Sequence, residues 1–154
     1  MRLDLDGGEA IFDESVELRF ISRSRRVLLG LIECLEGAPR RARARLEQAV
    51  ELDPELVNAW LLLGLMAESE EDFAEAARCY GEAVRRKAEA QLAHQRLAFL
   101  SLRRGDREEA MPHLWAWVEG QKDESAPLLH LSAALEEIGR DEEAGRVLDR
   151  ALAL

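Results

Sequence analysis

The sequence repeats a pattern of small and apolar residues every 34 positions, and this period constrains the fold more than any other feature. Leucine recurs in one column of the period, at Leu29, Leu63, Leu97 and Leu131. The next column is always small, with Gly30, Gly64, Ala98 and Ser132. A third column is always alanine, at Ala42, Ala76, Ala110 and Ala144. Two more columns hold Leu46, Tyr80, Leu114 and Leu148, and then Ala49, Ala83, Trp117 and Ala151. The pattern predicts four units that start near residues 23, 57, 91 and 125.

Each unit has the pattern of two packed helices. Apolar residues make up 47% of the chain and charged residues 34%, and β-branched residues are sparse, which favours helices over a sheet. Small residues in register let two antiparallel helices approach closely, while the leucine columns fill the space between them. One such pair cannot bury both of its faces, so neighbouring pairs must stack. The sequence therefore predicts an all-α solenoid with a concave and a convex face.

The second unit resembles a known family, the tetratricopeptide repeat (TPR). The residues that carry the resemblance are Trp60, Leu63, Gly64, Ala76, Tyr80 and Ala83. The resemblance extends over residues 23–154 and implies a right-handed α-solenoid of four helix-turn-helix repeats. Proteins of this family mostly bind partner proteins and seldom catalyse reactions, so the resemblance implies an interaction module and not an enzyme.

Residues 1–22 precede the repeats and are expected to form a helical capping segment. Their apolar residues have helical spacing, although Val16, Leu18 and Phe20 also alternate as in a strand. No glycine or proline lies between Glu9 and Leu29, which favours a helix that runs into the first repeat. This segment either covers the end of the solenoid or lies in a groove.

The third unit departs from the pattern at two positions. Trp117 replaces the alanine of its column, and Pro112 lies inside the expected second helix, where proline removes a hydrogen bond and kinks the chain. One interpretation is that the kink reshapes the groove or exposes Trp115 to a partner. We favour the other interpretation, in which Trp117 fills the gap and the repeat has only repacked.

The fourth unit ends at Leu154 without a further polar helix. Repeat proteins usually cover a terminal apolar face with a polar cap. We therefore expect Val147, Leu148, Leu152 and Leu154 to be partly exposed. Such a face is suited to a homodimer contact or to docking of another protein.

No pattern in the sequence indicates catalysis. His94, His113 and His130 lie in different columns and lack further ligands at metal spacing, and Cys34 and Cys79 are isolated. There is no phosphate loop and no nucleophile elbow. We therefore expect no catalytic residue, no metal and no cofactor. The net charge of −10 argues against a nucleic-acid partner, and no stretch is apolar enough to insert into a membrane.

The family resemblance implies that the first helix of each pair lines a concave groove. The matching positions are Val27 and Leu31, then Asn58, Leu61 and Leu65, then Leu92, Gln95, Arg96, Phe99 and Leu102, and finally Leu129. The same columns also include Glu68. This surface is mainly apolar, with Asn58, Gln95 and Arg96 as polar groups that could orient a peptide.

A subgroup of the family holds acidic chaperone tails with Lys and Asn on these helices. The matching positions here are Val27, Leu31, Leu62, Leu92 and Arg96. Because only Arg96 has the required chemistry, we reject that function for this chain. An apolar groove suits an amphipathic helix or an extended hydrophobic peptide.

Charge is unevenly distributed between the first two units. Residues 19–45 contain eight arginines and two glutamates, a net charge of +6, whereas residues 46–75 contain nine acids and no base. The arginine-rich stretch is a solvated helix face, or it contacts an acidic partner or the acidic second repeat of a neighbouring copy.

The sequence thus favours a cytoplasmic, bacterial adaptor that binds a helix or hydrophobic peptide of another protein. The alternative is a small acidic chaperone, similar to those of type III secretion, that keeps an apolar export substrate soluble. Co-expression separates the two hypotheses, because a chaperone's client is insoluble without it.

Overall fold

The computed structural model describes residue 30 and residues 37–87 and 90–154. Within these residues the chain forms helices and no strand, so the prediction of an all-α fold is confirmed. The helices are α2 (Pro39–Leu52), α3 (Val57–Ser69), α4 (Phe73–Arg86), α5 (Gln91–Arg103), α6 (Arg107–Gly120), α7 (Ser125–Glu137) and α8 (Asp141–Leu152). The predictions for residues 1–22, Val27 and Leu31 fall outside the described residues.

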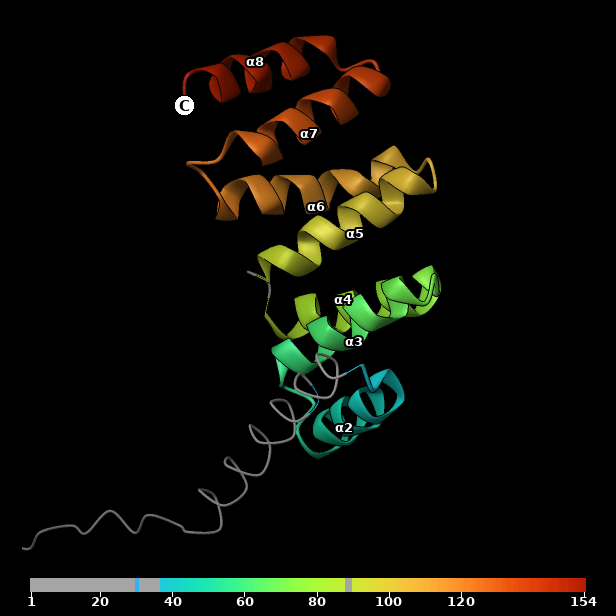
Figure 1. Cartoon of the computed structure of the whole chain (residues 1–154). Helices are drawn as coiled ribbons and strands as arrows, with labels where there is room; N and C mark the ends of the chain where they lie inside the picture. Colours follow the sequence, from blue (N-terminus) through green and yellow to red (C-terminus); the bar gives the residue numbers. More distant parts are fainter. Residues whose placement is uncertain (1–29, 31–36, 88–89) are drawn as a thin grey trace, which may run out of the picture.

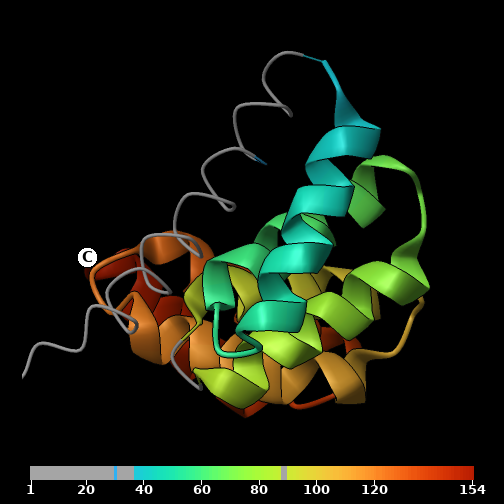
Figure 2. The ribbon, with the colours of Figure 1, turned by 90° about the horizontal axis from the view of Figure 1, so that it is seen from below.

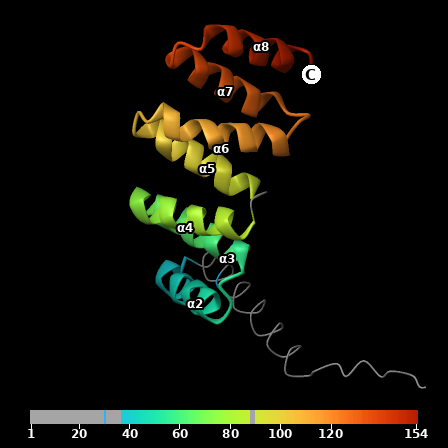
Figure 3. The ribbon, with the colours of Figure 1, turned by 180° about the vertical axis from the view of Figure 1, so that it is seen from behind.

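The helices pack as antiparallel pairs that stack in chain order (Figure 1). The closest packing is within the pairs α3–α4, α5–α6 and α7–α8, and each pair also contacts the next one. Figure 3 shows the same succession from behind, and in Figure 2 the later helices lie behind α2. This arrangement is a TPR-type α-solenoid. The division into a segment 1–22 and a repeat domain 23–154 stays a prediction.

The turns inside the pairs share one backbone conformation. Gly37, Gly105 and Gly139 occupy one column of the repeat, and their φ angles are 75°, 80° and 76°. Glycine adopts positive φ without steric cost. Glu71 occupies the same column in the second repeat and has a φ of 61°, so the turn imposes this conformation even where a side chain opposes it.

The column of Gly30, Gly64, Ala98 and Ser132 holds only small residues because a large side chain of the second helix packs directly against it. A Cβ atom on Gly64 would lie 2.4 Å from the Tyr80 ring, and one on Gly30 would lie 3.0 Å from Leu46 Cγ. Tyr80 and Leu46 are both fully buried. The columns recognised in the sequence are therefore the two sides of one contact between the helices of a pair.

The third repeat accommodates its two unusual residues without breaking α6. That helix continues from Arg107 to Gly120, and Pro112 is exposed on its surface. The Trp117 side chain is only 4% exposed and belongs to a core shared with α7 and α8. Trp115 packs partly against the same core. That the third repeat has only repacked stays a prediction.

The exposure of the apolar residues at the end of the chain is only partly as predicted. Leu152 is 76% exposed and Leu154 is 60% exposed. Val147, however, is buried in the core beneath α8, and Leu148 is half-buried. The exposed apolar surface therefore lies at the end of the helix and is smaller than the sequence suggested.

Candidate peptide-binding site

The predicted groove residues lie on the first helix of each pair. Asn58, Leu61 and Leu65 are on α3, Leu92, Gln95, Arg96, Phe99 and Leu102 are on α5, and Leu129 is on α7. None of these nine side chains is fully buried. Leu92 and Leu129 are 36% and 47% exposed, which is high for leucine on a packed helix.

A hollow of about 460 Å³ lies where α3 and α5 begin. It brings together three of the predicted residues, namely Asn58, Leu61 and Leu92. The sequence did not indicate the others, which are Glu55, Leu56, Val57, Lys87, Ala90 and Gln91. Most of them lie in or beside the connections before α3 and α5, where no repeat column could identify them. The wall is mixed: it combines apolar side chains with the polar groups of Asn58 and Gln91 and the charged groups of Glu55 and Lys87.

A polar link between α3 and α4, among the predicted groove positions, depends on Gly64. Because Gly64 has no side chain, the Tyr80 ring packs beneath α3, and the Tyr80 hydroxyl donates a hydrogen bond of 2.5 Å to Glu68 Oε2. Burial, followed by this hydrogen bond, raises the pKa of Tyr80, so the phenol stays protonated and remains a donor. This hydrogen bond fixes the position of the Glu68 carboxylate.

Arg96 reaches the same carboxylate from α5. Its Nε lies 3.8 Å from Glu68 Oε2, close enough for charge attraction but too far for a hydrogen bond. Within the described residues this buried Nε has no hydrogen-bond acceptor. The Arg96 side chain as a whole is 37% exposed, so the accessible part of the guanidinium group is not the buried Nε.

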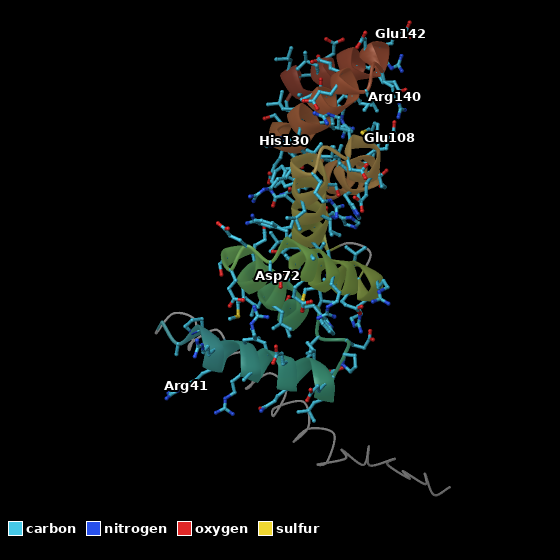
Figure 4. All side chains as sticks on the ribbon, turned by 90° about the vertical axis from the view of Figure 1, so that its right-hand side faces the viewer. Arg41, Asp72, Glu108, His130, Arg140 and Glu142 are labelled. Atoms are coloured by element: carbon cyan, nitrogen blue, oxygen red, sulfur yellow. The ribbon has the colours of Figure 1, made fainter. Side chains whose placement is uncertain are left out.

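Three aromatic rings meet where α5, α6 and α7 adjoin. The Trp117 ring stacks on His130 with centroids 5.6 Å apart, and Phe99 meets both rings edge-on. Phe99 was predicted as a groove residue, whereas Trp117 and His130 were not. His130 projects from α7 on the side of the stack away from Glu108 and Arg140 (Figure 4). Of the three rings, Trp117 is buried, Phe99 is half-buried and His130, which follows Leu129 in the chain, is exposed.

The described residues offer little that could support chemistry. No group of three or more His, Cys, Asp and Glu side chains among them is arranged to hold a metal ion. Burial, and then the nearby Glu75 carboxylate, raise the pKa of the Cys79 thiol to about 11, so it is protonated and a poor nucleophile at neutral pH. None of the helices in this part of the chain is long and apolar enough to cross a bilayer.

Comparisons with known proteins agree with the architecture. The sequence model of the tetratricopeptide repeat matches residues 57–89, and no curated protein sequence matches the chain. The crystal structure of MamA is similar with a TM-score of 0.74 and 18% identity, over 91% of this chain and 82% of that one. The structure of YrrB, a TPR protein with an unusual peptide-binding site, has a TM-score of 0.76 and 19% identity, over 92% of this chain and 73% of that one. At these identities the likeness shows the fold.

Proposed function

We propose that this chain, which has the fold of tetratricopeptide-repeat proteins and matches their sequence model at residues 57–89, binds a helix or hydrophobic peptide of a partner protein in a groove of α3, α5 and α7. In this function the chain acts as a non-catalytic adaptor. We also propose that it works in the cytoplasm, and that its partner is a protein and not a nucleic acid, because the net charge is −10.

The hollow between α3 and α5 is the observation that carries this proposal. Apolar side chains from two repeats converge there, at Leu56, Val57, Leu61 and Leu92. Pockets that bind peptides combine an apolar wall with a few polar groups that fix orientation. A volume of about 460 Å³ is sufficient for a large apolar side chain of a partner, which would serve as the anchor.

Polar groups along the groove would orient the bound peptide. Asn58 is exposed beside the hollow, and the partly exposed guanidinium group of Arg96 would supply further donors about one helical turn beyond Leu92 on α5. An extended peptide presents backbone carbonyls that such donors can bind. The relative YrrB, with its peptide-binding site, supports the choice of a peptide as ligand.

Exposed leucines allow a matched test of the groove. Leu92→Glu and Leu129→Glu each place a charge in the proposed groove, whereas Leu52→Glu makes the same change on α2, where the leucine is 55% exposed. Because all three side chains are exposed, each variant should fold, which circular dichroism would check. The three variants and the wild type are used as baits in pull-downs from lysate of the source organism, with mass spectrometry as readout.

A partner held in the groove is enriched by the wild type and by Leu52→Glu, and lost with Leu92→Glu and Leu129→Glu. Burying one glutamate against an apolar anchor should weaken binding at least about tenfold, because an unpaired buried charge is costly. If every folded variant retains the same proteins, the groove is not the binding surface.

We further propose that the exposed end of α8 forms a homodimer contact. Leu152 and Leu154 are the apolar residues concerned, and apolar side chains so exposed favour association. Light scattering coupled to size exclusion should report a dimer for the wild type and a monomer for Leu152→Glu/Leu154→Glu. Such a dimer should persist at high salt, whereas a contact between basic and acidic repeats would dissociate. A wild-type monomer would exclude the contact.

A further inference from the structure

Two histidines meet inside the third repeat. His94 on α5 and His113 on α6 approach with their Nδ1 atoms 3.0 Å apart, and their ring centroids are 5.2 Å apart. His94 is only 7% exposed and His113 is half-buried. A nitrogen–nitrogen distance of 3.0 Å is that of a hydrogen bond, so one Nδ1 carries a proton and the other accepts it.

Packing alone does not require histidines at these positions. Moving 34 residues along the chain gives the equivalent pair Trp60 and Cys79 in the second repeat, and Leu128 and Val147 in the fourth. These residues belong to the hydrophobic core at the corresponding places. The third repeat therefore replaces an apolar contact between its two helices with a contact that depends on protonation.

The geometry allows one shared proton but not two. If both rings were charged, two N–H donors would face each other at 3.0 Å, with no acceptor between them and with two positive charges in contact. We propose that the His94–His113 pair is a pH-sensitive latch, which holds α5 against α6 at neutral pH and loosens the third repeat on mild acidification.

Among the described residues, the nearby carboxylates offset this effect only in part. Glu109 lies one turn before His113 on α6, but its carboxylate already accepts hydrogen bonds from Ser101 and Arg104 of α5 and the turn that follows it. On the other side of α6, Glu137 of α7 pairs with Arg107, and His130 of α7 stacks on Trp117.

The pKa of His113 agrees with this assignment. Burial lowers it first, and the neighbouring His94 lowers it further, while Glu109 acts in the opposite direction. The folded state disfavours the charged His113 ring. The unfolded chain therefore binds more protons than the folded chain once the pH falls below about 6.5, the ordinary pKa of histidine. The contribution of His113 to stability is thus complete above that pH and is lost as the pH falls below it.

Loosening α5 would also affect the groove, a consequence that rests on the proposed function. α5 carries Leu92, Arg96 and Phe99, so a partner bound there would be released more readily at low pH. The latch itself is a property of the chain alone, and it can be tested without a partner.

The repeats supply a matched variant for the test. The double variant His94→Leu/His113→Val, here called the paired variant, installs the two residues found at these positions in the fourth repeat. It removes both titratable imidazoles and replaces their contact with an apolar one. His130→Gln removes the third histidine and leaves the pair intact. Thermal unfolding of the full chain is followed at pH 7.5, 6.5 and 5.5, a range above that in which most carboxylates titrate. NMR of the imidazole carbons follows each histidine over the same range.

The latch predicts that acidification to pH 5.5 lowers the Tm of the wild type and of His130→Gln by roughly 2–4 °C more than that of the paired variant. The His113 resonance should titrate below pH 6.5. An equal fall of Tm in all three proteins, or a His113 midpoint at or above the ordinary histidine value, would overturn the proposal. If the paired variant is unfolded, the NMR titration of the wild type alone decides.

Discussion

Single residues decide how closely the helices of each pair approach. Gly64 allows the Tyr80 ring to lie directly beneath α3, and the Tyr80 hydroxyl then hydrogen-bonds to Glu68. The small column was evident from the sequence because its neighbours are equally small in every repeat. The hydrogen bond between Tyr80 and Glu68 was not evident from the sequence, because it depends on which turn of α3 lies above the Tyr80 ring.

Two glycines only 17 residues apart should therefore respond oppositely to alanine. In Gly64→Ala the new Cβ lies within 3 Å of three Tyr80 ring atoms, so we expect a loss of about 1–3 kcal/mol in the free energy of unfolding. Gly81→Ala on α4 meets no atom within 4 Å and should gain about 0.5–1 kcal/mol from helix propensity. Urea unfolding measures both, and equal effects would show that the Gly64–Tyr80 contact is not tight.

At the scale of elements, the period predicted the paired helices because every copy places the same side chains at the same contacts. It could not predict the hollow, because part of its wall comes from the connections before α3 and α5, including Glu55 and Ala90. It also did not reveal the histidine pair. His94 and His113 lie in different columns, and only folding of the pair α5–α6 shows that those columns touch.

α6 should be more stable without its proline. Pro112 is exposed inside a continuous helix and cannot donate to the carbonyl of Glu108, so Pro112→Ala should raise the free energy of unfolding by up to about 3 kcal/mol. Arg146 occupies the same column in α8 and is also exposed, so Arg146→Ala serves as the control with a change near zero. Denaturant unfolding compares the two. A proline variant no more stable than the wild type would mean that α6 has already relaxed around the missing hydrogen bond.

At the scale of the whole molecule, the uneven charge contributes to contacts within the chain. Arg43 on α2 pairs with Glu70 at the end of α3, at 2.6 Å, so the basic first repeat and the acidic second repeat attract each other directly. Arg41, in contrast, projects away from the stack (Figure 4). The charge runs were clear in the sequence, but their partners were not, because Arg43 and Glu70 are 27 residues apart.

The stack also determines where a partner can bind. The largest exposed apolar side chains of the described residues are Leu52, Leu92, Leu129, Leu152 and Leu154. Two of these line the proposed groove, two lie at the end of α8, and Leu52 lies on α2. If a partner binds in the proposed groove, its contacts should therefore concentrate at positions 92 and 129.

In-cell photo-crosslinking tests this claim most directly. A photoreactive amino acid is placed at position 92, 129 or 52 of the full chain, one at a time, and the crosslinked proteins are identified by mass spectrometry. The account predicts that positions 92 and 129 capture the same partner and that position 52 does not. Capture of that partner from position 52 alone, or equally from all three positions, would contradict binding in the groove.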